Sequence, residues 1–220
     1  MKVIITGVTG MVGEGVLHEC VLSNNISSIL VIGRKPCGYE NLKVSELILS
    51  DFMNLSGQEE KLSGYDACFF CSGVSWTKYS EEDYKKITYD LTLYFANFLL
   101  KLNSNMVFSY ISGQGTDSSE KGFYKWAQIK GKTENDLMKL PFKKVYLFRP
   151  GYMHPTPGLK NTLSMYQYFK IFYPLIKIIT PNSATTLGEL GQAMINSVVR
   201  DYPKNIIEVE DILKLAKIEQ

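Results

Sequence analysis

A glycine-rich segment near the start of the chain constrains the fold more than any other feature. Lys2–Thr6 is a short, largely β-branched run, and Val12–Leu22 carries apolar residues at helical spacing. Between these two runs the sequence reads Thr6-Gly7-Val8-Thr9-Gly10-Met11-Val12-Gly13. Three glycines in this context permit a tight turn, close approach of the backbone to a pyrophosphate and close packing of a helix. We therefore predict a dinucleotide-binding turn, with an ordinary strand-to-helix turn as the alternative.

Strands and helices are expected to alternate through the rest of the chain. Further strands are expected at Ser28–Ile32, Glu46–Leu49, Asp66–Cys71, Met106–Ile111 and Lys144–Phe148, and helices at Glu81–Leu102, Tyr124–Leu140 and Leu187–Val199. This alternation favours an α/β fold, a doubly wound parallel sheet of the Rossmann type with helices on both faces and a small C-terminal helical cap. We expect residues 1–220 to form a single domain in which residues 152–182 cover the substrate side.

Composition and charge exclude several classes of protein. The chain has 220 residues with 45% hydrophobic and 21% charged residues, which is typical of a globular domain and not of a disordered chain. A formal net charge of +2 gives no electrostatic reason to expect nucleic-acid binding. The start of the chain does not have the pattern of a signal peptide, so we expect a cytoplasmic location.

Metal, redox and membrane sites are not expected. Cys68 and Cys71 have C-x-x-C spacing, but they lie in an apolar run that favours a buried strand over a metal or redox pair. The two histidines, His18 and His154, lack nearby thiolates or carboxylate clusters. The aromatic stretch 163–179 is too short and too often interrupted to span a bilayer, and it is interpreted as a helix pair of the core or pocket. A homodimer surface and a membrane-surface helix are its alternatives.

The glycine segment resembles that of the short-chain dehydrogenase/reductase superfamily, and of its atypical branch in particular. Its spacing is G-x-x-G-x-x-G, and weaker matches follow in later loops and helices. These matches are Cys71-Ser72-Gly73, Ser112-Gly113, Lys130-Gly131-Lys132-Thr133-Glu134, Phe148-Arg149-Pro150-Gly151 and the segment from Thr185 to Met194. The branch contains NmrA-like regulators, Tat-interacting-protein-like oxidoreductases and small epimerase/dehydratase relatives.

The sequence after the second expected strand bears on the choice of cofactor. Arg34 and Lys35 stand where an acidic residue would bind the ribose 2′-hydroxyl of NAD, so two cations favour the 2′-phosphate of NADP. A solvated basic turn is the alternative. The resemblance places Asp51 and Phe52 at the adenine, although Asp51 also suits a helix N-cap. The residues expected around the cofactor are Gly7, Thr9, Gly10, Met11, Val12, Gly13, Arg34, Lys35, Asp51, Phe52, Ser72, Gly73, Lys130, Pro150, Gly151 and Tyr152.

The resemblance also implies a catalytic serine, tyrosine and lysine, of which two are matched. Ser112 corresponds to the serine that orients a carbonyl, and Lys130 to the lysine that binds the nicotinamide ribose. Trp126 occupies the tyrosine position, and an indole cannot exchange a proton near neutral pH. Tyr124 is the replacement candidate if the helix begins after it, and Tyr110 is a weaker one for which core packing is the alternative.

These observations predict an atypical NADP(H)-dependent oxidoreductase that transfers hydride between NADPH and a small carbonyl or related acceptor. The segment after Gly151 is expected to border the nicotinamide, with Tyr152, Met153 and His154 as pocket walls. The replacement by Trp126 keeps a non-catalytic NADP(H)-sensing regulator open as an alternative, and an epimerase- or dehydratase-like enzyme is a third. Either enzyme would take a small-molecule substrate.

Overall fold

A parallel sheet of seven strands forms the centre of the computed structural model, which describes residues 1–161 and 183–218. All neighbouring strands are parallel, in the order β3-β2-β1-β4-β5-β6-β9. The strands are β1 (Lys2–Thr6), β2 (Ser28–Gly33), β3 (Val44–Ile48), β4 (Ala67–Phe70), β5 (Val107–Ile111), β6 (Lys144–Arg149) and β9 (Ile206–Glu208). The strand order reverses direction between β1 and β4, which creates the crevice where open α/β sheets bind ligands.

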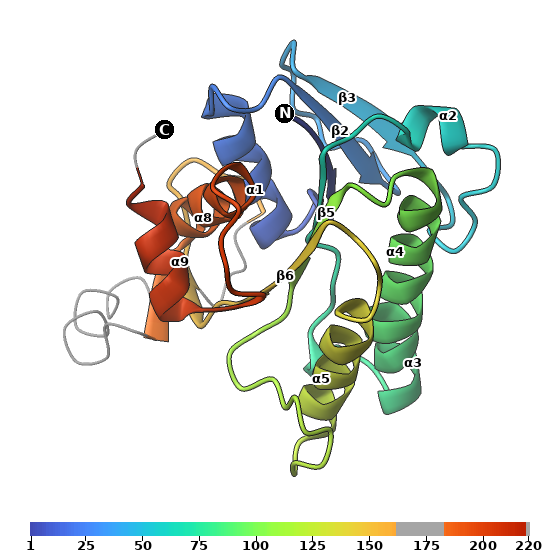
Figure 1. Cartoon of the computed structure of the whole chain (residues 1–220), viewed down its shortest axis with the longest axis vertical. Helices are drawn as coiled ribbons and strands as arrows, with labels where there is room; N and C mark the ends of the chain where they lie inside the picture. Colours follow the sequence, from blue (N-terminus) through green and yellow to red (C-terminus); the bar gives the residue numbers. More distant parts are fainter. Residues whose placement is uncertain (162–182, 219–220) are drawn as a thin grey trace.

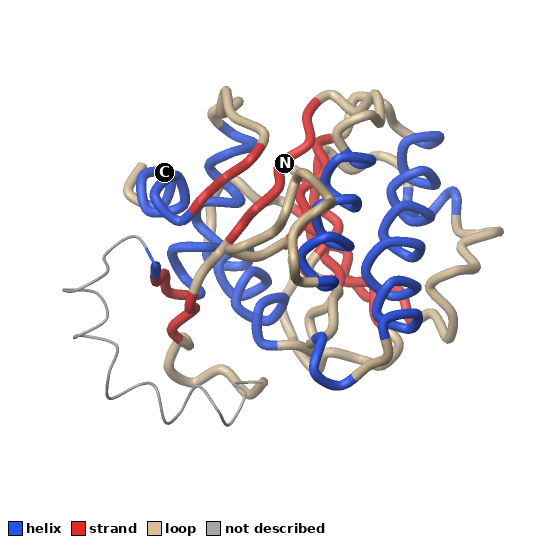
Figure 2. Tube along the Cα trace, turned by 90° about the horizontal axis from the view of Figure 1, so that it is seen from below, coloured by secondary structure: helices blue, strands red, loops and turns tan. Residues whose placement is uncertain are grey.

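Helices cover both faces of this sheet, as Figures 1 and 2 show. One face is covered by α1 (Met11–Leu22), α8 (Leu187–Val199) and α9 (Val209–Ala216), and the other by α4 (Leu91–Leu102) and α5 (Lys125–Leu137). Because successive side chains of a strand point to opposite faces, β1 contributes Val3 and Ile5 to one apolar cluster and Ile4 to the other. The predicted Rossmann-type α/β fold is confirmed.

Several predicted boundaries shift in the structure. β3 begins two residues before the predicted strand Glu46–Leu49 and ends one residue earlier. The predicted helix Glu81–Leu102 consists of α3 (Glu81–Lys85), a π-helical segment Lys86–Asp90 and α4. A π-helical turn keeps the apolar spacing of the surrounding helix almost intact, so periodicity alone does not reveal it.

The C-terminal region differs most from the prediction. β9 pairs with β6 and extends the predicted six-stranded sheet by a seventh strand. Two further short strands, β7 (Tyr152–His154) and β8 (Ala184–Thr186), form a separate parallel pair. Three-residue strands are too short to show an alternating pattern. The remaining short elements are α2 (Glu59–Leu62) and a 3₁₀ turn at Trp76–Lys78.

The cysteine motif lies where the sequence predicted. Cys68 is buried in β4 in the cluster under α4, whereas Cys71 packs against the cluster on the opposite face. Burial raises the pKa of the Cys68 thiol well above its usual value. Within residues 1–161 and 183–218, no group of three or more His, Cys, Asp or Glu residues is arranged to hold a metal ion.

Two regions of interest fall outside the described part of the chain. The aromatic stretch 163–179 lies within residues 162–182, and the chain end comprises residues 219–220. Most of the predicted substrate-side cap, residues 152–182, therefore also lies outside the description. Among the described helices, none is long and apolar enough to cross a membrane.

Candidate functional site

The glycine-rich turn between β1 and α1 is closed so tightly that side chains would not fit at two of its positions. Gly7 has φ +73°, and a Cβ there would lie 2.6 Å from the carbonyl carbon of Cys71. A Cβ on Gly13 would lie 2.3 Å from the carbonyl oxygen of Gly7. Both distances are far below van der Waals contact, so the turn requires glycine at these positions.

The first turn of α1 presents backbone N–H groups at this site. Gly10 is the N-cap residue, its N–H donates to the Gly7 carbonyl at 2.9 Å, and it supplies no side-chain cap to the helix. The first N–H groups of a helix have no partners within the helix, and the helix dipole favours an anion beside them. Met11, Val12 and Gly13 form this first turn, which is suited to bind a phosphate group.

The loops that follow the central strands meet at the same edge of the sheet. The backbone N–H of Ser72 donates to Thr6 Oγ1 at 3.2 Å, which joins the loop after β4 to the glycine-rich turn. The N–H of Ser112 donates to the Phe148 carbonyl at 2.8 Å, and that of Gln114 to the Pro150 carbonyl at 3.0 Å. Hydrogen bonds therefore join these segments in two pairs, the turn after β1 with the loop after β4, and the loop after β5 with the end of β6.

The predicted adenosine-side residues follow β2 and β3. Arg34 and Lys35 are exposed immediately after β2, and Thr9 is exposed on the glycine-rich turn. Asp51 accepts a hydrogen bond from the backbone N–H of Met53 at 2.8 Å, so it caps a turn and not a helix. The ring of Phe52 stacks on Phe95 of α4, with ring centroids 6.2 Å apart.

Three further predicted site residues follow β4 and β5 or lie on α5: Gly73, Ser112 and Lys130. Gly73 is exposed beside Ser72, and a side chain at this position would meet open space. Ser112 is buried and its hydroxyl contacts Thr116 Oγ1 at 2.9 Å. Thr116 donates its hydrogen to the Gly113 carbonyl, so the Ser112 hydroxyl is the donor in the bond to Thr116. Ser112 must turn away from Thr116 before it can donate to a substrate.

The ammonium group of Lys130 lies at the carboxyl end of β5. Its Nζ donates to the carbonyl oxygens of Ile111 at 3.4 Å and Ser112 at 3.2 Å, and it lies 5.3 Å from the ring centroid of Tyr110. Burial lowers the pKa of Lys130 to about 8, although the negative charge of Glu134 acts to raise it. Desolvation dominates because it disfavours the charged form of the amine.

The three aromatic residues considered for proton transfer occupy different environments. Trp126 lies in the first turn of α5, half-buried, and a side chain on Gly115 would meet its ring at 3.5 Å. Tyr124 precedes the helix in an extended conformation, is 62% exposed, and its ring packs edge-on against Phe123. Tyr110 is buried in β5, and burial raises the pKa of its hydroxyl well above the usual value.

The segment after β6 runs beside the loop that carries Gln114. Pro150 is buried and accepts the Gln114 hydrogen bond, and Gly151 lies against the backbone of Ser183. Tyr152, Met153 and His154 form β7 with intermediate exposure. Their role as walls of a nicotinamide pocket stays a prediction.

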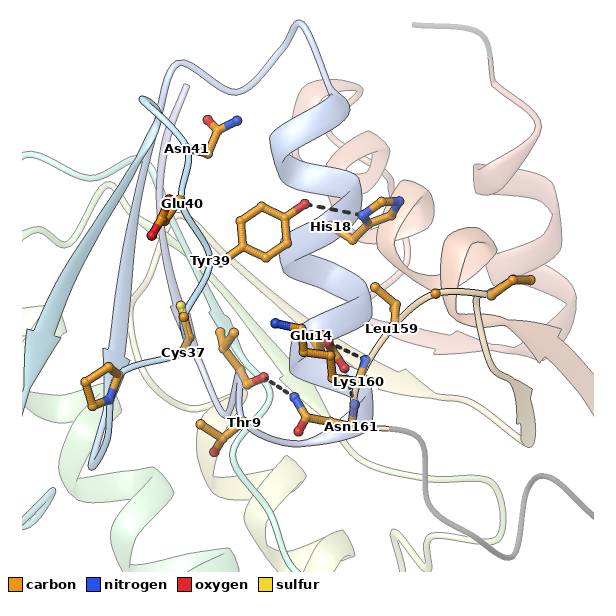
Figure 3. Close-up of a pocket in the computed structure, with 15 residues that line it drawn as sticks. Thr9, Glu14, His18, Cys37, Tyr39, Glu40, Asn41, Leu159, Lys160 and Asn161 are labelled. Carbon is orange, nitrogen blue, oxygen red and sulfur yellow. Dashed lines mark hydrogen bonds between the residues drawn. The ribbon is translucent and has the colours of Figure 1, made fainter.

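A cavity of about 670 Å³ opens beside the glycine-rich turn, between α1 and the loop after β2. Figure 3 shows that Tyr39 of that loop points toward His18 of α1, and Tyr39 Oη lies 3.4 Å from His18 Nδ1. The loop 157–161 borders the cavity on the far side. Glu14 of α1 is buried here, and its two oxygens accept the backbone N–H groups of Lys160 at 2.8 Å and Asn161 at 2.7 Å.

The contacts of Glu14 were not predicted from the sequence. A carboxylate in the first turn of a helix is favoured by the helix dipole, and this local preference is the signal that the sequence carries. The partners of Glu14 lie 146 and 147 residues away, and no local pattern identifies them. The consequence is a direct link between the glycine-rich turn and the loop 157–161.

Comparison with known proteins identifies relatives that match between two thirds and nearly all of the chain. It is 28% identical to Protein HTATIP2 of Rattus norvegicus over 68% of this chain and 62% of that protein. It is 27% identical to Protein FMP52, mitochondrial, of Candida albicans over 98% of both chains. The FMP52 protein of Meyerozyma guilliermondii is 30% identical over 69% of this chain and 64% of its own length. No family model matches the chain.

Solved structures share the fold at low sequence identity. A glucuronic acid dehydrogenase from Chromohalobacter salexigens superposes with a TM-score of 0.67 at 12% identity, over 94% of this chain and 75% of that one. A UDP-glucuronic acid 4-epimerase from Bacillus cereus, crystallised with UDP-glucuronic acid and NAD, gives 0.65 at 13% identity over 95% and 77%. At these identities the likeness establishes the fold alone.

The relatives also correct one prediction. We expected a cytoplasmic location from the start of the sequence, but the FMP52 proteins of several fungi are named as mitochondrial. The cytoplasmic prediction is therefore wrong. Its basis was the absence of a secretory signal pattern, which does not distinguish the cytoplasm from an organelle.

Proposed function

Because this chain belongs to the atypical branch of the short-chain dehydrogenase/reductase superfamily, with HTATIP2 and FMP52 proteins among its relatives, we propose that it is an NADP(H)-binding oxidoreductase. The proposed reaction is hydride transfer between NADPH and a small carbonyl or related acceptor. The observation that carries the proposal is the glycine-rich turn, in which Gly7 and Gly13 leave no room for a Cβ beside the uncapped first turn of α1.

The residues at the carboxyl edge of the sheet fit a dinucleotide. The first-turn N–H groups of α1 are suited to the pyrophosphate, and Ser72 and Gly73 to the adjoining ribose. Arg34 is exposed directly after β2, where its guanidinium is suited to a 2′-phosphate. The segment from Pro150 to Tyr152 is suited to border the nicotinamide.

The proposed chemistry divides between the cofactor and this chain. A bound nicotinamide supplies hydride chemistry, and the residues of the chain position the acceptor. Ser112 would orient the acceptor carbonyl after its hydroxyl turns away from Thr116. Lys130 would hold the nicotinamide ribose from its position on the Ile111 and Ser112 carbonyls.

Calorimetric titration with NADPH and NADH tests the proposed cofactor. We expect the wild-type protein to bind NADPH more tightly, and Arg34→Ala to weaken NADPH binding by about 10- to 150-fold, because a hydrogen bond to a charged group contributes roughly 1.5–3 kcal/mol. NADH binding should not change in this variant. Lys61→Ala, which removes an exposed cation on α2, is the matched control and should bind NADPH like the wild type. Folded protein that binds neither nucleotide would contradict the proposal.

Trp126 supports a second candidate function, a regulator that binds NADP(H) without turnover. The indole stands at the position of the acid/base tyrosine and cannot take over its proton transfer. Such a regulator would bind NADPH in the titration but would consume none of it with carbonyl acceptors. An epimerase or dehydratase would convert substrate without net consumption of NADPH.

The names of the FMP52 relatives support a mitochondrial location for this chain as well. Immunodetection in fractionated cells tests this location. Recovery with a mitochondrial marker is the expected result, and recovery outside that fraction would contradict it.

A further inference from the structure

We propose that Lys130 is itself the proton donor of the reaction, in place of the tyrosine that Trp126 replaces. This inference rests on the proposed oxidoreductase function and assigns the acid/base group of the same site. Lys130 would thus act directly on the acceptor, with its remaining hydrogen directed to the acceptor oxygen in place of the ribose.

The position of the ammonium group is the first support. Lys130 Nζ has three hydrogens, of which two are directed to the Ile111 and Ser112 carbonyls at the end of β5. The third hydrogen is available for a group bound beside Ser112. The side chain is half-buried, so part of it is open to solvent.

The neighbouring side chains are the second support, because no carboxylate in residues 1–161 and 183–218 forms an ion pair with the ammonium. Tyr110 of β5 offers the face of its ring at 5.3 Å. Glu134, one helical turn further along α5, is bound through both oxygens to Arg149 of β6. Glu134 is therefore the charged group that acts on Lys130 through space, and Arg149 holds it in place. Burial lowers the pKa of Lys130 to about 8, so the amine can give and take a proton near neutral pH.

The other candidates are less suited to donate. Trp126 donates a hydrogen bond but does not exchange its proton. Tyr110 is fully buried in β5. Tyr124 is 62% exposed and its ring packs against Phe123, whereas a donor to the carbonyl requires a water-excluded environment. The Ser112 hydroxyl donates to Thr116.

The step balances when the reductant is a reduced nicotinamide dinucleotide. The carbonyl carbon receives a hydride and forms a C–H bond, while the π electrons of C=O form an O–H bond with the proton from Lys130 Nζ. The carbonyl is reduced to an alcohol, the nicotinamide is oxidised, and Lys130 is left as a neutral amine. Protonation by water restores the ammonium.

A titration of the cofactor-free protein gives a readout that does not depend on turnover. The ¹³Cε resonance of Lys130, assigned by its loss in Lys130→Arg, is followed by NMR from pH 6 to 11. We expect a midpoint near pH 8, in contrast to the ordinary lysine value of about 10.4. A midpoint above pH 10 would overturn the proposal.

The pH dependence of turnover gives the second readout, with NADPH and 4-nitrobenzaldehyde as the acceptor. We expect kcat/KM for reduction to fall about tenfold per pH unit above pH 8, because only the ammonium form donates. Lys130→Arg keeps the charge but cannot lose a proton, so kcat should fall by about 10²- to 10⁴-fold while the Kd for NADPH stays within about threefold. Lys132→Arg, on the same helix and paired with Asp136, is the control and should behave like the wild type.

The outcomes separate this inference from the proposed function. A wild-type protein without NADPH binding contradicts the proposed function itself. A protein that turns over NADPH but keeps its activity in Lys130→Arg contradicts the role of Lys130 alone. Activity that survives in Lys130→Arg and disappears in Tyr124→Phe assigns proton donation to Tyr124.

Discussion

Arg149 at the end of β6 binds both carboxylate oxygens of Glu134 on α5. Its Nε donates to Glu134 Oε1 at 3.0 Å and its Nη2 donates to Glu134 Oε2, in a buried two-pronged contact. The same guanidinium donates to Ser118 Oγ at 2.6 Å and to Glu208 of β9 at 3.1 Å. Because Glu134 lies one helical turn after Lys130, this pair fixes the helix that carries Lys130 against the sheet.

We predict that Glu134→Ala lowers the free energy of unfolding by about 3–5 kcal/mol, because it leaves the buried guanidinium without its main partner. Urea denaturation measures the change. Glu208→Gln is the matched control, since the side chain of Glu208 is 48% exposed and its pair with Arg149 is expected to contribute about 0–1 kcal/mol. If both variants lost the same free energy of unfolding, the buried Glu134–Arg149 pair would contribute no more than the exposed Glu208–Arg149 pair, which would contradict the prediction.

Gly13→Ala is predicted to open the glycine-rich turn. The added Cβ would lie 2.3 Å from the Gly7 carbonyl oxygen. Because this oxygen belongs to the backbone, it can move away only if the whole turn changes its conformation. We expect a loss of about 1–3 kcal/mol in stability and a loss of NADPH binding by calorimetry. Gly113→Ala, where the Cβ meets open space, should change stability by less than about 1 kcal/mol. NADPH binding that survives in Gly13→Ala would contradict a phosphate site at this turn.

Glu14→Gln is predicted to loosen the loop 157–161. The amide has one acceptor oxygen where the carboxylate has two, so one charge-assisted bond to the Lys160 or Asn161 N–H is lost. Such a bond contributes roughly 1.5–3 kcal/mol, which corresponds to about 10- to 150-fold faster amide hydrogen exchange at these residues. Glu19→Gln is the control on the same helix, because Glu19 binds the Gln192 side chain. Unchanged exchange in Glu14→Gln would show that other contacts hold the loop.

Asp211 is predicted to make stability depend on pH in the acid range. Burial acts to raise its pKa, but the hydrogen bonds from Lys204 and Tyr202 outweigh it and hold the pKa of Asp211 below its usual value. A carboxylate with a lowered pKa in the folded state adds stability above its unfolded pKa of about 3.9, and loses it as pH falls through the folded pKa.

The variant Asp211→Asn should therefore be less stable than the wild type at pH 7, and the difference should shrink as the pH falls below about 4. Urea denaturation at pH 7, 5 and 3 measures this difference. Glu210→Gln, which removes an exposed pair with Lys214, is the control and should have a small effect at each pH. If the stability difference between the wild type and Asp211→Asn were the same at all three pH values, the lowered pKa of Asp211 would not be the cause of the pH dependence.

The positions of the candidate site residues along the sheet were predictable, because these residues follow strands that the sequence marks clearly. Ser112 follows β5 and Arg34 follows β2, and parallel strands end at the same edge of a sheet. The start of α5 was less predictable. The sequence indicated a helix from Tyr124, but the helix begins at Lys125 and leaves Tyr124 in an extended conformation. This one-residue difference depends on how the preceding loop packs, which a local pattern does not contain.

The sequence by itself determined the alternation of strands and helices, the glycine-rich turn and the replacement of the expected tyrosine by Trp126. These features follow from local periodicity, backbone freedom and side-chain chemistry, each of which acts within a few residues. The tertiary structure alone decided that β9 joins β6, that Glu14 holds the loop 157–161 and that Arg149 binds Glu134. Such contacts form between residues far apart in the chain, and burial and exclusion of water select them only once the sheet has assembled.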